Sequence, residues 1–126
     1  MDITAELDAM RADVPGCALV AYADLSSQLV LSASAATNPV QEEMNALSQA
    51  AQLSLDGAFA EAAAASWGGE GPAEMALLMT GDEVRLFLRS PATKAEALIA
   101  VLAPDAELDA VLSRARATLV RIGAQG

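Results

Sequence analysis

The run Glu-Ala-Leu-Ile-Ala-Val-Leu-Ala-Pro, residues 96–104, constrains the fold of this chain more than any other stretch. Every position from 97 to 103 is apolar, so a strand here would have two apolar faces. Such a strand must be covered on both sides. A buried helix can have the same composition, but the run is short for a helix and Pro104 ends it. The run therefore predicts the central strand of a sheet that has helices on both faces.

Length and charge limit the classes of function. The 126 residues, of which 54% are hydrophobic, predict one domain over residues 1–126 with a substantial core. The formal net charge is -10, which argues against nucleic acid and anionic membrane surfaces as partners because phosphate contacts need clustered Lys and Arg. The charge is also uneven: residues 1–84 contain thirteen acids and one base, whereas residues 85–126 contain four acids and six bases. This split indicates either a basic patch on an acidic body or a simple difference between the surfaces of the elements.

Cysteine usage and the first residues indicate a cellular location. Cys17 is the only cysteine, so no internal disulfide is possible and a reducing compartment is expected. Residues 1–6 lack the basic start and apolar region of a signal peptide. No stretch reaches the roughly 18 consecutive apolar residues of a transmembrane helix. We therefore expect a cytoplasmic protein without membrane insertion.

Three segments have the apolar spacing of a helix. They cover residues 3–12, about 39–65, and a stretch that follows Pro104 and ends at Gly123. A stripe on the second helix is predicted to pack on the sheet: Val40, Met44, Leu47, Ala51, Leu55 and Phe59. Ala46, Ala50 and Leu53 add apolar surface beside this stripe, more than one sheet face needs.

Strand patterns fill the remaining segments. Residues 17–24 are apolar on both faces, and residues 28–34 alternate, which favours a hairpin whose second strand lies nearer an edge. Residues 74–80 and 83–89 form a second hairpin across a Gly-Asp turn. The predicted order is helix, two strands, helix, three strands, helix.

No set of residues in the sequence specifies a reaction. The chain has no histidine, which removes the commonest general base and metal ligand. Cys17 starts a doubly apolar strand and is interpreted as a packed structural residue. Asp105, Glu107 and Asp109 have the spacing of a calcium loop, but the glycine and the final Glu of that loop are missing. We expect no catalytic residue, no metal and no cofactor.

Several stretches resemble the Roadblock / dynein light chain family, whose fold is close to profilin and longin domains. They are Val14-Pro15-Gly16-Cys17-Ala18-Leu19-Val20 before and in the first strand, Leu29-Val30-Leu31-Ser32-Ala33 in the second, and Leu98-Ile99-Ala100-Val101-Leu102-Ala103-Pro104 before the last helix. The chain departs from the family at the first hairpin turn, residues 24–28, where the family often has an Asp-Gly turn.

The resemblance implies an α+β fold with one antiparallel five-stranded sheet in the order 2-1-5-4-3. Helices 1 and 3 would cover one face and helix 2 the other. It also implies a homodimer formed by paired second helices and by the edge strand 74–80. The implied dimer interface comprises Ala46, Ala50, Leu53, Met75, Leu77 and Met79.

Proteins of this family are non-catalytic platforms, and many bind or regulate small Ras-like GTPases or act as adaptors. The implied partner site lies on helix 2 and comprises Glu42, Asn45 and Gln49. The competing site is a basic strip of Arg85, Arg89 and Lys94, which the strand pattern predicts to be solvated. The alternative function is a small-ligand sensor of profilin-like fold, which would need a deep apolar pocket between helix and sheet.

Overall fold

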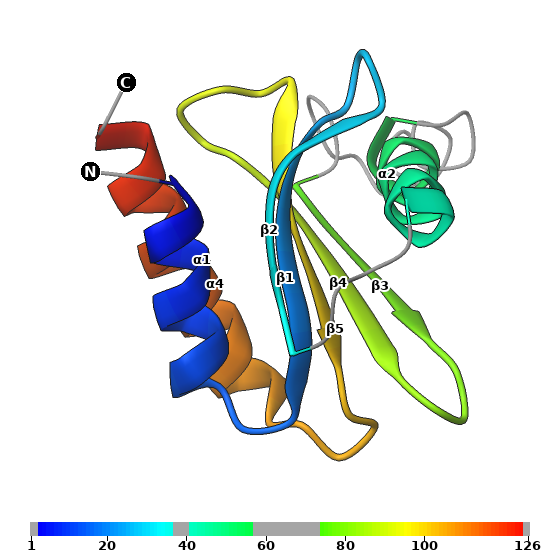
Figure 1. Cartoon of the computed structure of the whole chain (residues 1–126), viewed down its shortest axis with the longest axis vertical. Helices are drawn as coiled ribbons and strands as arrows, with labels where there is room; N and C mark the ends of the chain where they lie inside the picture. Colours follow the sequence, from blue (N-terminus) through cyan, green and yellow to red (C-terminus); the bar gives the residue numbers. More distant parts are fainter. Residues whose placement is uncertain (1–2, 37–40, 57–73, 125–126) are drawn as a thin grey trace, which may run out of the picture.

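The computed structural model describes residues 3–36, 41–56 and 74–124. Over these residues the chain folds into three helices and one five-stranded sheet (Figure 1). The elements are α1 (Ile3–Asp13), β1 (Cys17–Asp24), β2 (Leu29–Ala35), α2 (Gln41–Asp56), β3 (Met75–Met79), β4 (Val84–Arg89), β5 (Glu96–Leu102) and α4 (Leu108–Ala124). None of the helices in the described ranges has the length and apolar character that crossing a membrane requires.

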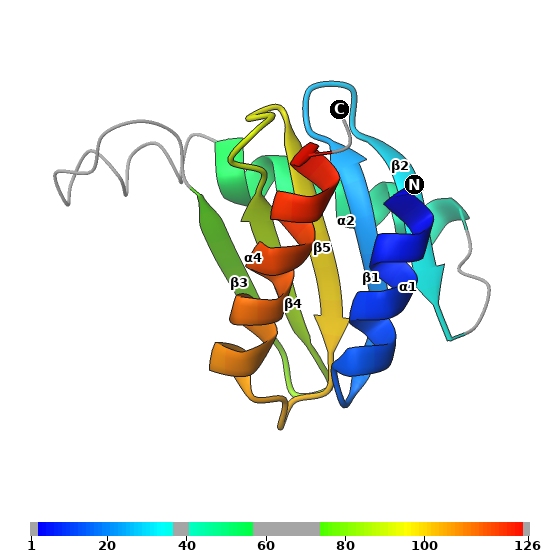
Figure 2. The same ribbon diagram turned by 90° about the vertical axis from the view of Figure 1, so that its left-hand side faces the viewer.

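The sheet is antiparallel throughout and has the order β2-β1-β5-β4-β3. This order confirms the prediction and puts β5 at the centre. Residues 97–100 of β5 are fully buried because helices cover both faces of the sheet. Helices α1 and α4 lie on one face, and α2 crosses the other face (Figures 1 and 2).

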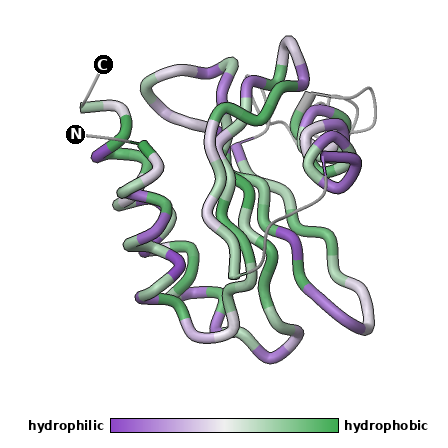
Figure 3. The backbone as a smooth tube through the Cα atoms, in the orientation of Figure 1, coloured by the Kyte–Doolittle hydropathy of each residue, from purple (hydrophilic) through white to green (hydrophobic). Residues whose placement is uncertain are grey.

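The two faces of the sheet carry separate cores. On one side, Leu98 and Leu102 of β5 pack with Leu86 of β4 and with residues of α1 and α4. On the other side, Ile99 of β5 and Phe87 of β4 pack with residues of α2. The hydropathy colouring in Figure 3 shows the resulting concentration of apolar residues along the central strands.

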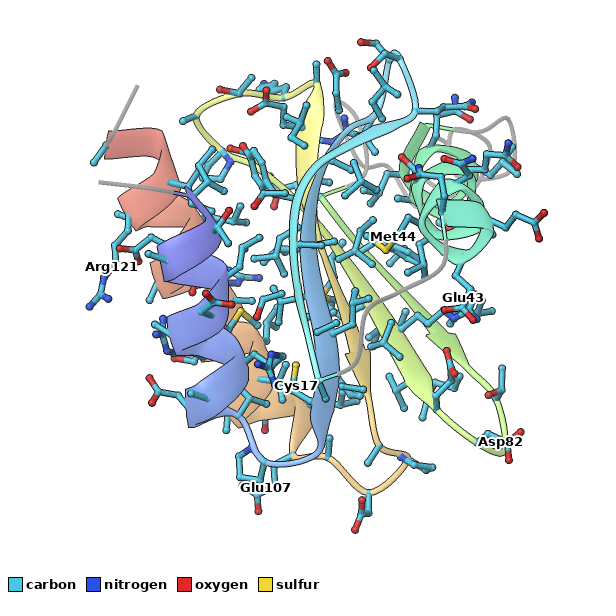
Figure 4. All side chains as sticks on the ribbon, viewed as in Figure 1. Cys17, Glu43, Met44, Asp82, Glu107 and Arg121 are labelled. Carbon is cyan, nitrogen blue, oxygen red and sulfur yellow. The ribbon has the colours of Figure 1, made fainter. Side chains whose placement is uncertain are left out.

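Helix α2 buries the stripe that its spacing predicts. Met44, Leu47, Ala51 and Leu55 are all at most 6% exposed. Figure 4 shows Met44 extending from α2 toward the sheet. The predicted helix was longer, and its residues 39–40 and 57–65 lie outside the described residues.

Two local features concern the first hairpin turn and the end of the last helix. Gln28 closes the first hairpin with a φ of 57°, in the left-handed region that favours glycine. Gly123 was predicted to stop the last helix, but α4 continues through it to Ala124. A Cβ at Gly123 would lie 2.9 Å from the Cβ of Ala92, so close approach of the β4–β5 loop explains this glycine.

Candidate interaction surface

The outward face of α2 lies opposite its buried stripe. An α-helix turns about 100° per residue, so Leu53 projects almost directly away from the buried residues Met44 and Leu55. Glu42, Gln49 and Leu53 are exposed on this side, and Leu53 is 64% exposed. The sequence placed Ala46, Ala50 and Leu53 beside the core stripe. Two of these, Ala46 and Leu53, are exposed, whereas Ala50 is half-buried and packs against the α2-side core.

Strand β3 forms an edge of the sheet. Within the described residues it pairs only with β4, in continuous register from Met75↔Leu88 to Met79↔Val84. The three residues predicted for the dimer interface, Met75, Leu77 and Met79, are 41%, 41% and 63% exposed. They share the sheet face of α1 and α4, because their partners on β4 belong to that core.

The opposite face of β3 adds one exposed residue that the sequence reading did not select. Leu78 is 44% exposed and pairs with Arg85, on the face that α2 partly covers. Its signal in the sequence was the unbroken apolar run of residues 75–79.

Most of the exposed apolar surface gathers on these two elements. Of the eight large hydrophobic residues that are exposed in the described part of the chain, five belong to α2 or β3. We call these five, with the polar residues beside them, the α2–β3 surface: Leu53, Met75, Leu77, Leu78 and Met79, with Glu42, Glu43, Asn45 and Gln49. The other three, Leu29, Leu31 and Val120, lie on β2 and α4. Figure 1 shows α2 and β3 on the same side of the molecule, away from α1 and α4.

The predicted basic strip is solvated only in part, because Lys94 is exposed and Arg85 is partly exposed, whereas Arg89 is buried. Arg89 is only 8% exposed, and its guanidinium donates hydrogen bonds to the backbone oxygens of Leu55 (3.1 Å) and Lys94 (2.6 Å). Arg85 is paired with Glu83 at 2.5 Å. Arg89 is therefore a structural residue that holds the C-terminal end of α2. The missed signal was the last turn of α2, which has no basic residue of its own to complement its carbonyl groups.

A second polar contact was not predicted from the sequence. The Tyr22 hydroxyl donates a hydrogen bond of 2.6 Å to Oε1 of Glu96, and the two residues are 74 positions apart in the chain. Burial and then this hydrogen bond raise the pKa of Tyr22 to about 12. The hydroxyl therefore stays protonated at neutral pH and links β1 to β5 on the α1–α4 side.

Cys17 lies at the start of β1, where its thiol packs partly against the α1–α4 core. The thiol donates a weak hydrogen bond to the backbone oxygen of Leu19 at 3.5 Å, and burial raises its pKa. A raised pKa lowers the thiolate fraction, so the geometry agrees with a packed structural cysteine.

An open cavity of about 420 Å³ lies between the end of α1 and the start of α4. The turn before β1 (Asp13–Gly16) and the start of α4 line it, with Arg114 bound to Asp13 at 3.1 Å. It is outside the interface between α2 and the sheet, where a sensor of small apolar ligands would need its pocket. Among the residues that the structure describes, no group of three or more acidic, cysteine or histidine side chains is arranged to hold a metal ion.

Comparison with known proteins identifies the fold. The sequence matches no family model, and it matches no curated protein. The structure is similar to a Roadblock/LC7 domain from Streptomyces avermitilis, with a TM-score of 0.79, 11% identity, and coverage of 97% of this chain and 95% of that one. It is similar to MglB of Myxococcus xanthus with a TM-score of 0.74, 13% identity, and coverage of 97% and 92%.

A third similar structure is an MglB with a tetrameric arrangement, which has a TM-score of 0.74 and 17% identity and covers 97% of this chain and 85% of that one. These similarities extend over nearly the whole chain. The chain therefore has the Roadblock/LC7 fold.

Proposed function

We propose that this protein is a non-catalytic homodimeric module that binds a small Ras-like GTPase and regulates it, or holds it in a signalling complex. The observation that carries the proposal is the α2–β3 surface, where a bare edge strand and five exposed large apolar residues occur together. The GTPase as the partner class follows from the family resemblance of the sequence and from the fold.

The edge strand supports self-association. A β-edge presents unpaired N–H and C=O groups to any second strand, and proteins usually protect such edges with charges, proline or bulges. Strand β3 has none of these: its sequence is Met-Ala-Leu-Leu-Met and its register with β4 is regular. A second copy of β3 would pair with the edge and cover Met75, Leu77 and Met79. The tetrameric MglB shows that a protein of this fold assembles from several copies.

Helix α2 supplies the rest of the proposed dimer contact. Among the described residues of α2, Ala46 is the exposed apolar residue that shares the outward side with Leu53. A second α2 beside the first would remove Leu53 and Ala46 from water, at about 25 cal/mol for each Å² of apolar surface. The proposed dimer thus uses two contacts: pairing along the β3 edge, with Met75, Leu77 and Met79 on the α1–α4 face of the sheet, and pairing of α2 on the opposite face.

Light scattering at micromolar concentration tests the dimer, and α2 offers a matched pair of variants. Leu53→Asp should give a folded monomer, because Leu53 is 64% exposed in the single chain. Leu47→Asp should unfold the domain, because Leu47 is 6% exposed and a buried unpaired charge costs several kcal/mol. A wild-type monomer, or a Leu53→Asp protein that remains dimeric, would remove α2 from the proposed interface.

The proposed class of partner is tested with purified Ras-like GTPases from the same organism, loaded with GDP or with a GTP analogue. We expect one of them to bind in a nucleotide-dependent way and to change its rate of hydrolysis or exchange. This chain alone should hydrolyse no GTP, because the sequence has no phosphate-binding loop. If no GTPase responds while the dimer forms, the function reduces to that of an adaptor for another partner class.

A further inference from the structure

The backbone hydrogen bonds between β3 and β4 show which groups of β3 point to its free edge. At one end of the pair, the N–H of Arg89 donates to the backbone oxygen of Glu74 at 2.7 Å. At the other end, the N–H of Thr80 donates to the backbone oxygen of Glu83 at 2.9 Å. Both groups of one strand residue point to the same side, and successive residues alternate. The even-numbered residues therefore bond to β4, and the N–H and C=O groups that point to the free edge belong to Met75, Leu77 and Met79.

This alternation limits how a second copy of β3 can pair with the first. In an antiparallel pair, two residues that lie directly opposite each other point their backbone groups either both into the interface or both away from it. A two-fold axis through the middle of the strand pair can therefore pass at residue 76, 77 or 78 of β3. An axis between two residues would put an outward-pointing residue opposite an inward-pointing one, and the bonds would not form.

We propose that two copies of this chain pair β3 with β3 in antiparallel register, with Leu77 on the two-fold axis. The inference rests on the proposed homodimer and adds the register to it. Leu77 then lies opposite the partner's Leu77, and Met75 lies opposite the partner's Met79, so every outward-pointing group of the three residues has a bonding partner. An axis at Ala76 would carry Met79 beyond the end of the partner's β3, and an axis at Leu78 would do the same to Met75.

The side chains of β3 fit this register on both faces of the sheet. On the α1–α4 face, Met75, Leu77 and Met79 would cover one another across the axis and leave water together. On the α2 face, Leu78, which is 44% exposed, would lie opposite the partner's Ala76, a small residue that packs against the α2-side core. An axis at Ala76 would instead put Leu78 opposite the exposed Glu74, which pairs an apolar side chain with a charge.

Disulfide trapping distinguishes the three registers, because the even-numbered residues form the non-hydrogen-bonded pairs. The Cα atoms of such a pair are about 4.5 Å apart, within the range of a disulfide. In a Cys17→Ala background, we expect Ala76→Cys chains mixed with Leu78→Cys chains to form a cross-linked heterodimer on mild oxidation. Neither variant alone should cross-link, because two copies of the same even-numbered residue would be diagonal neighbours about 7–8 Å apart. Leu31→Cys on the exposed part of β2, mixed with Leu78→Cys, is the control for random collision.

Hydrogen exchange tests the same register in the unmodified protein. The amides of Met75, Leu77 and Met79 face solvent in the single chain and would bond to the partner in the dimer. Their exchange should slow by about tenfold or more, all three together, as the protein concentration rises through the range in which light scattering shows the dimer to form. Amides of the other edge strand, β2, should not respond to concentration.

Each other outcome contradicts a definite part of the inference. Cross-linking of Ala76→Cys alone would place the axis at residue 76, and cross-linking of Leu78→Cys alone would place it at residue 78; both would overturn the register and leave the dimer standing. A dimer that shows neither cross-linking nor slowed exchange on β3 would mean that the second copy does not use this edge. A wild-type monomer in light scattering would overturn the register together with the proposed dimer.

Discussion

Replacing Arg89 should loosen α2 more than any other element. In the folded protein the buried guanidinium donates to the backbone oxygens of Leu55 and Lys94. Net values for hydrogen bonds to charged groups are about 1.5–3 kcal/mol each, and they are not fully additive. Arg89→Met keeps most of the apolar stem and leaves both oxygens without this donor. We therefore expect the free energy of unfolding to fall by about 2–4 kcal/mol.

Urea unfolding at one fixed protein concentration measures this loss, because a dimer makes the apparent stability depend on concentration. Hydrogen exchange then shows which element loses stability. Relative to the wild type, Arg89→Met should accelerate amide exchange more in α2 than in α1, which packs on the other sheet face. Arg89→Lys is the matched control. It keeps the positive charge, but a single ammonium cannot reach both oxygens as the planar guanidinium does, so its loss should be intermediate.

Two results would refute this reasoning about Arg89. One is a loss below about 1 kcal/mol in Arg89→Met, which would mean that water replaces the guanidinium without cost. The other is an equal acceleration of exchange in α1 and α2, which would mean that Arg89 stabilises the whole sheet and not the attachment of α2.

Three further predictions concern the pH response, a helix–loop contact and the thiol. Burial and Glu96 raise the pKa of the single tyrosine, Tyr22, from 10.0 to about 12, so its contribution to stability is complete below pH 10 and is lost as the pH rises to about 12. Tyr22→Phe should lack this loss in alkaline unfolding curves, and ultraviolet titration of the wild type should show ionisation well above pH 10. Gly123→Ala should destabilise the protein by about 1 kcal/mol in thermal unfolding despite the helix preference of alanine, because its Cβ would lie 2.9 Å from the Cβ of Ala92. Adding Ala92→Gly should recover this stability, and a double variant whose loss equals the sum of the two single losses would contradict this. Cys17 should react with a thiol reagent at pH 8 several times more slowly in the folded protein than in urea, because burial raises its pKa, and equal rates would show that the thiol is accessible.

The sequence predicted the parts of the fold that periodicity encodes. The doubly apolar run at residues 97–103 identified the central strand, and the spacing of Met44, Leu47, Ala51 and Leu55 identified the buried side of α2. These patterns are local, because a residue's face follows from its position in its own helix or strand. The order of the strands came from the resemblance, since alternation alone does not say which strands are neighbours.

The sequence could not predict contacts between residues that are distant in the chain. Strand alternation puts Arg85 and Arg89 on one face and so predicted that both are solvated. Arg89 is buried because the C-terminal end of α2 packs over it, and its guanidinium binds the backbone oxygen of Leu55, 34 residues earlier in the chain. Likewise, nothing near Tyr22 in the sequence indicates its bond to Glu96. The candidate surface had a local signal, the unbroken apolar run of β3, but only the sheet order shows that this run forms an edge.

The two edges of the sheet differ in a way that supports β3 as the site of assembly. On β2, the register with β1 shifts between Tyr22 and Ala23, which marks a bulge, and the polar residues Ser32 and Ser34 are bound to Thr4 and Arg11 of α1. Bulges and polar side chains of this kind hinder pairing with another strand. On β3 the register is regular and the residues are apolar on both faces. An edge without protection would favour aggregation in a monomer, so we infer that β3 is covered by a second strand when the protein functions, whereas β2 remains an edge.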